Sequence, residues 1–99
     1  MARTPEGTAY DLSGPENAPT VVLIHGLGLS RGSTWGVIAP LLARHFRVLS
    51  YDLPGHGQSA PHIRPLTLTI LSEQLVTLMD RLALPHAALV GFSLGGMIN

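Results

Sequence analysis

Apolar runs alternate with turn-rich segments along this chain, and three of the runs predict β-strands. They are Thr20–Ile24 (TVVLI), residues 46–51 (FRVLSY) and residues 87–92 (AALVGF), and each leads into a loop that contains glycine. A continuous apolar run, as opposed to a strict alternation, is typical of a strand covered on both faces in a parallel sheet. We therefore expect these three strands to lie in one buried sheet.

A leucine stripe predicts a long amphipathic helix between the second and third strands. We expect it to begin at Thr67 or Thr69 and to end at Leu84, because Pro85 disfavours helical geometry in the residue before it. Its apolar face recurs at steps of three and four residues and consists of Leu68, Leu71, Leu75, Leu78 and Leu82. This stripe is expected to pack into the core.

A second helix is expected between the first two strands. Ser33 or Thr34 is the predicted N-cap, and the regular helix should begin near Pro40, because proline lacks a backbone N–H and is tolerated only in a first turn. The apolar face predicted for this segment consists of Trp35, Ile38, Leu41 and Leu42.

The first 19 residues are divided by prolines and glycines around a short strand-like piece, residues 8–12, and predict an edge hairpin. Strands and helices then alternate to the end of the chain. This order predicts right-handed crossovers and an α/β fold built on a parallel sheet.

Composition excludes several classes of function. The net charge is zero, and the six basic residues, all arginine, form no basic stripe, so we expect no nucleic-acid partner. Without cysteine there is no disulfide, thiolate metal site or cysteine nucleophile. The five histidines fall on different expected elements, so we expect no metal site and no cofactor.

Length and hydropathy bear on the setting of the chain. A hydrophobic content of 45% in 99 residues is high for a free-standing domain and predicts that the chain is part of a larger fold. The longest aliphatic run, residues 21–24, is far shorter than the ~20 residues that span a bilayer. The N-terminus lacks the apolar core of a signal peptide, so we expect no membrane association and a cytoplasmic location.

The end of the third strand carries a G-x-S-x-G motif formed by Gly91, Ser93 and Gly95. This pattern is typical of a nucleophile elbow, a tight turn from strand into helix that exposes the serine hydroxyl. Glycines suit the flanking positions because side chains would collide there. Leu94 would then offer its backbone N–H to a developing oxyanion at a helix N-terminus. The alternative is a glycine-rich turn with an idle serine.

Two more motifs follow the first two strands: His25-Gly26-Leu27-Gly28, and residues 51–59 (YDLPGHGQS). Together with the elbow they resemble the α/β-hydrolase fold family over nearly the whole chain, most closely its 3-oxoadipate enol-lactonases and related carboxylesterases. The resemblance implies a serine nucleophile with two oxyanion-hole N–H groups, and these residues are Ser93, Leu27 and Leu94. It also implies supporting roles for His25, Gly26, Gly28, Asp52, Gly91 and Gly95.

The resemblance further implies an acyl-transfer hydrolase acting on a small ester, lactone or similar substrate. Because the family places its acid and histidine after the serine and only six residues follow Ser93, we expect both to lie beyond this chain. Residues 1–99 would then be the N-terminal part of one hydrolase domain, inactive and poorly soluble alone. Of the local histidines, His25 is expected to brace the oxyanion turn, and His56 and His45 are not expected to act as the base. The sequence carries no signal for an oligomeric state.

Two other functions fit part of the pattern. A dinucleotide-binding βαβ unit of the NAD type would use Gly26-Leu27-Gly28 for the phosphates and Asp52 for the ribose, but Arg31 stands where the third glycine would be. A non-catalytic member of the hydrolase fold, binding a ligand or a partner, is the second alternative.

Overall fold

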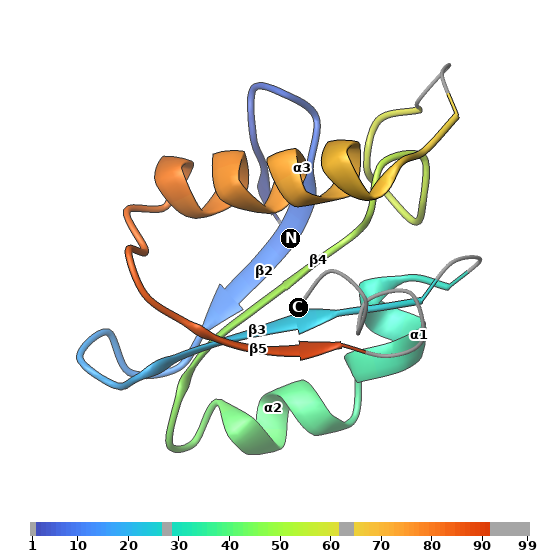
Figure 1. Ribbon diagram of the computed structural model, residues 1–99. Helices are drawn as coiled ribbons and strands as arrows, with labels where there is room; N and C mark the ends of the chain where they lie inside the picture. Colours follow the sequence, from blue (N-terminus) through green and yellow to red (C-terminus); the bar gives the residue numbers. More distant parts are fainter. Residues whose placement is uncertain (1, 27–28, 62–64, 92–99) are drawn as a thin grey trace.

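The computed structural model describes residues 2–26, 29–61 and 65–91. They form three layers, with a five-stranded sheet between two layers of helices (Figure 1). The strand order is β1-β2-β4-β3-β5. Figure 1 shows α3 on one face of the sheet and α1 and α2 on the other. The strands are β1 (Ala2–Arg3), β2 (Ala9–Ser13), β3 (Thr20–Ile24), β4 (Arg47–Tyr51) and β5 (Ala88–Gly91). The helices are α1 (Arg31–Trp35), α2 (Ile38–Leu42) and α3 (Leu68–Arg81).

The predicted parallel strands are confirmed. β3 lies between β4 and β5 and is parallel to both. At its carboxyl end Ile24 pairs with Tyr51 on one side and Gly91 on the other, so the three strands end level with one another. The loops that follow them therefore start at one edge of the sheet.

The expected edge hairpin is also confirmed, and it makes the sheet a mixed one. β1 pairs antiparallel with β2, and β2 pairs antiparallel with β4. In register, Tyr10 of β2 lies opposite Tyr51 of β4. At the other side of the sheet, β5 pairs with β3 and is an edge strand within the described part of the chain.

Helix α3 buries most of the predicted leucine stripe. Thr67 caps its N-terminus by accepting a hydrogen bond from the Ile70 N–H. Three leucines are buried, but Leu68 is 45% exposed because it occupies the first turn. The buried stripe packs with sheet residues in a cluster that contains Val22, Ile24, Leu49, Tyr51, Leu53, Leu71, Leu75 and Leu78.

The predicted end of α3 at Leu84 is wrong, because the helix ends at Arg81. Ala83 adopts a left-handed φ of +54°, and its N–H donates to the Asp80 carbonyl while the N–H of Leu84 donates to that of Met79. These two bonds form a Schellman cap, which here uses alanine where glycine is usual. The left-handed backbone of Ala83 therefore ends the helix, three residues before the position at which Pro85 was expected to end it.

The segment between β3 and β4 forms two short helices, where a single apolar face was expected. Ser30, not Ser33 or Thr34, caps α1, in a reciprocal capping box with Ser33. Pro40 lies in the first turn of α2, as predicted. The helix is interrupted between Trp35 and Ile38, so the residues on either side of the interruption do not share one face. Trp35 is buried against Val21, Leu23 and Val48, whereas Ile38 and Leu41 are exposed.

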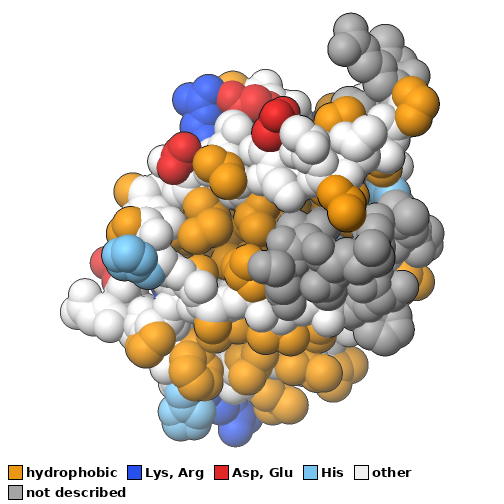
Figure 2. Space-filling model, in the orientation of Figure 1, with side chains coloured by type: hydrophobic (Ala, Val, Ile, Leu, Met, Phe, Trp, Pro, Cys, Tyr) orange, Lys and Arg blue, Asp and Glu red, His pale blue; other side chains and the backbone are white. Residues whose placement is uncertain are grey.

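Hydrophobic side chains accordingly remain on the surface around α2. Val37, Ile38 and Leu41 are 81%, 47% and 54% exposed. Figure 2 shows the hydrophobic atoms gathered over this part of the molecule. Among the described residues, none of the helices has the length and apolar content needed to cross a membrane.

Candidate active site

The carboxyl ends of β3, β4 and β5 bring the three sequence motifs to one edge of the sheet. His25 and Gly26 follow β3, Asp52 follows β4, and Gly91 ends β5. Loops at this end of parallel strands commonly form ligand sites. The predicted nucleophile Ser93 lies outside the described residues, as do Leu27, Gly28, Leu94 and Gly95.

His25 is fully buried, and both ring nitrogens have backbone partners. Nε2 accepts a hydrogen bond from the Leu53 N–H at 3.0 Å, and Nδ1 lies 2.7 Å from the Gly26 carbonyl oxygen. A nitrogen that accepts carries no proton, so we assign the neutral ring with its hydrogen on Nδ1. Burial lowers the pKa of His25 and favours the same neutral form. This histidine braces the turn after β3.

Asp52 is fully buried and holds the loop that follows β4. Its carboxylate accepts hydrogen bonds from the backbone N–H groups of Arg31 at 2.8 Å and Gln58 at 2.9 Å, and also pairs with the Arg31 guanidinium. Its backbone carbonyl accepts from Ser59 Oγ at 2.6 Å and from Gln74 Nε2 at 3.0 Å. Both carboxylate oxygens of Asp52 are therefore bonded to groups of this chain, which argues against a ribose-binding role.

Gly57 and Ser59 complete this loop. Gly57 has a φ of +49°, and a Cβ built there would lie 2.4 Å from an Asp52 carboxylate oxygen, so only glycine fits beside the carboxylate. The Ser59 hydroxyl donates to the Asp52 carbonyl and accepts from the Ala9 N–H at 3.0 Å. Because the Ser59 hydroxyl both donates and accepts a hydrogen bond within the fold, we assign Ser59 a structural role.

Arg31 is a site residue that the sequence analysis missed. Its Nε lies 2.7 Å from an Asp11 carboxylate oxygen, its Nη2 lies 3.0 Å from Gln58 Oε1, and its Nη1 pairs with Asp52. Burial alone would raise the pKa of Asp11, but the hydrogen bond and charge of Arg31 lower it below its usual value. No local pattern distinguishes Arg31, since its partners lie 20 or more positions away.

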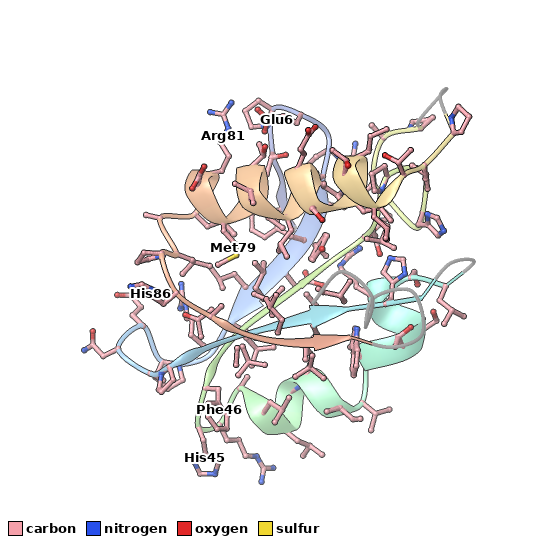
Figure 3. All side chains as sticks on the ribbon, in the orientation of Figure 1. Glu6, His45, Phe46, Met79, Arg81 and His86 are labelled. Carbon is pink, nitrogen blue, oxygen red and sulfur yellow. The ribbon has the colours of Figure 1, made fainter. Side chains whose placement is uncertain are left out.

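The other described histidines lie at different ends of the sheet. His56 lies near His25, with ring centroids 5.4 Å apart, and its Nδ1 is 3.0 Å from the Pro54 carbonyl oxygen. His45 and His86 precede β4 and β5, and Figure 3 shows both rings toward the end of the sheet from which the strands begin. His62 lies outside the described residues. Within the described ranges no three His, Cys, Asp or Glu side chains gather as a metal site would need.

Known proteins are similar to this chain in both sequence and fold. A family model of the alpha/beta hydrolase fold matches residues 19–98. The 3-oxoadipate enol-lactonase 1 of Acinetobacter baylyi is 38% identical over 89 residues, covering 90% of this chain and 33% of that protein. A pimeloyl-[acyl-carrier protein] methyl ester esterase of Sodalis glossinidius is 42% identical over 79 residues, covering 79% of this chain and 28% of that protein.

The structural comparison agrees. The crystal structure of the enol-lactonase from Burkholderia xenovorans matches with a TM-score of 0.86 and 38% sequence identity, over 92% of this chain and 35% of that one. The chain thus spans about a third or less of the length of these similar proteins. Over that part, the chain is similar to these proteins in sequence and in fold.

Proposed function

We propose that this chain, which belongs to the alpha/beta hydrolase fold family, is the N-terminal part of a serine hydrolase that cleaves an ester, lactone or similar acyl substrate. The observation that supports the proposal is the level ending of β3, β4 and β5, which brings His25, Asp52 and Gly91, one described residue from each motif, to one edge of the sheet. The names of similar proteins, an enol-lactonase and a methyl ester esterase, support an acyl substrate.

In this mechanism Ser93 is the nucleophile. Its hydroxyl attacks the substrate carbonyl while a histidine base takes the proton, and the backbone N–H groups of Leu27 and Leu94 stabilise the tetrahedral oxyanion. One such donor is typically worth about 10²–10³ in rate. The acyl group passes to Ser93, the alcohol leaves, and water then releases the acid.

The base and its orienting acid are proposed to lie in a later part of the protein. His25 is unsuited to the role because its Nε2 already accepts from the Leu53 N–H and its ring is fully buried. The 99-residue chain alone is therefore expected to be inactive. The coding sequence downstream of Asn99 tests this directly, since it must encode a strand-ending Asp or Glu followed by a loop histidine.

The decisive experiment compares Ser93→Ala with Ser72→Ala, an exposed serine of α3, in the complete protein. We expect Ser93→Ala to lower kcat/KM for p-nitrophenyl acetate by about 10³-fold or more, because loss of the nucleophile removes the covalent route. Ser72→Ala should match the wild type. Full activity in Ser93→Ala would remove this serine from the mechanism, and an inactive wild type would favour a non-catalytic binding protein.

A further inference from the structure

The Arg31 guanidinium joins β2 to the loop after β4 at the carboxyl edge of the sheet. Nε contacts Asp11 on β2, Nη1 contacts Asp52 after β4, and Nη2 contacts Gln58 in the following loop. Each of its three nitrogens has an acceptor, and the side chain is only 11% exposed. A planar guanidinium with fixed donor directions fits such a site, and a lysine ammonium cannot reproduce it.

Arg31 is also the cation that compensates the buried Asp52. The Asp52 side chain is fully buried, and an uncompensated carboxylate in that position would be strongly unfavourable. His25 lies 3.9 Å from the same carboxylate, but its Nε2 accepts the Leu53 N–H and so carries no positive charge. The charge balance of Asp52 therefore depends on Arg31.

The position of Arg31 in the chain gives these contacts a functional consequence. Arg31 is the first residue of α1, and its backbone N–H donates to Asp52, so the downstream end of the segment 25–31 is fixed there. At the upstream end, His25 accepts from the Leu53 N–H. Two consecutive residues, Asp52 and Leu53, thus hold both ends of the segment.

We infer that Arg31 is a positioning residue for hydrolysis, and that it acts by holding this segment in the geometry the oxyanion requires. The inference rests on the proposed function, in which the segment supplies the oxyanion N–H of Leu27. An oxyanion contact forms only in the transition state, so its misplacement lowers kcat and leaves KM nearly unchanged. Arg31 itself does not touch the substrate in this role.

The test replaces Arg31 by lysine in the complete protein, with Arg81→Lys as the matched control. Arg81 also pairs with a carboxylate, that of Glu6. Arg81 is the last residue of α3, and Figure 3 shows this pair away from the carboxyl ends of the parallel strands. With p-nitrophenyl acetate we expect Arg31→Lys to lower kcat by about 10- to 100-fold with KM within about 2-fold, in line with the effect of weakening an oxyanion donor. Arg81→Lys should leave both constants unchanged.

Phenylboronic acid separates positioning from a purely structural role. It forms a tetrahedral adduct with a nucleophilic serine, so its affinity reports the oxyanion geometry. A loss of folded protein lowers the measured kcat but leaves the inhibition constant of the remaining active enzyme unchanged. For Arg31→Lys we expect the inhibition constant to rise by the same factor by which kcat/KM falls.

A milder variant covers the case in which Arg31→Lys does not fold. Asp11→Ala removes one guanidinium partner whose side chain is 49% exposed, so it leaves no buried charge unpaired. It should lower kcat and weaken phenylboronic acid binding in parallel, by about 3-fold or more, as expected for a partly released oxyanion donor. Unchanged kcat and inhibition constants in the folded variants would overturn this inference alone. An active Ser93→Ala protein, or an inactive wild type, would overturn the proposed function and this inference with it.

Discussion

The imidazole Nε2 of His25 accepts a hydrogen bond from the backbone N–H of Leu53 at 3.0 Å. This bond requires an unprotonated Nε2, and it links the turn after β3 to the loop after β4. Protonation of the ring would replace an acceptor by a donor that faces another donor. The stability of the protein should therefore depend on the protonation state of His25.

The direction of this pH dependence follows from the lowered pKa. Burial lowers the pKa of His25 in the folded state from the ordinary value of 6.5, so the unfolded chain binds the proton more readily. The contribution to stability is complete above that ordinary value and is lost as the pH falls below it. We expect the wild type to lose up to about 1.4 kcal/mol per pH unit in this window.

The measurement is the free energy of unfolding against pH for the wild type, His25→Gln and His45→Gln. Glutamine at position 25 can still accept a hydrogen bond but does not titrate, so the loss below neutral pH should be reduced. His45 is exposed and serves as the control for removing one imidazole. Parallel curves for the wild type and His25→Gln would contradict the assignment of a neutral, accepting ring.

Gly57 should not tolerate a side chain. Gly57→Ala would place a Cβ 2.4 Å from the buried Asp52 carboxylate and would strain a backbone with a φ of +49°. We expect a loss of about 2 kcal/mol or more in the free energy of unfolding. The matched control is Gly32→Ala, where a Cβ meets nothing within 4 Å. In helix α1 that change should be neutral or slightly stabilising.

Ala83→Gly should stabilise the protein. Ala83 holds a left-handed φ of +54° at the end of α3, a geometry that costs alanine about 1–2 kcal/mol and glycine nearly nothing. We expect a gain of about 0.5–1 kcal/mol in thermal or denaturant unfolding, after the greater freedom of glycine in the unfolded chain is counted. Ala43→Gly at the C-cap of α2, where φ is −65°, should instead destabilise. The same sign for both changes would contradict the Schellman cap.

Leu78 should account for a large share of the packing of α3 on the sheet. It is 1% exposed in the cluster around Val22 and Leu49. Leu78→Ala should cost about 2–5 kcal/mol, since it removes buried methyl groups and leaves a cavity. Val76 lies on the same helix but is 58% exposed, so Val76→Ala should change the stability by less than about 0.5 kcal/mol.

The isolated 99-residue chain should self-associate. Within the described residues β5 pairs only with β3, and Val90 on it is 42% exposed. A strand edge without a second partner strand is a site at which another copy can pair. Light scattering of the purified chain should show oligomers that grow with concentration. A monodisperse monomer with a cooperative melting transition would contradict this expectation.

Local sequence determined the elements and their order. The run Thr20–Ile24 is a strand with the predicted bounds, because β-branched side chains pack well on the pleated surface of a sheet. The leucine stripe places α3, and the three motifs follow the strands that carry them. These features depend on residues within a few positions of one another, so the sequence alone defines them.

Tertiary structure decided what depends on distant partners. Arg31 reaches Asp11, Asp52 and Gln58 across 20 or more positions, and the neutral state of His25 depends on an N–H 28 positions away. The end of α3 at Arg81 is local but was also not predictable, because alanine seldom adopts the left-handed backbone angle that Ala83 has there. Long-range hydrogen bonds and charge pairs form only when the sheet brings these groups together. For that reason they are absent from any local pattern in the sequence.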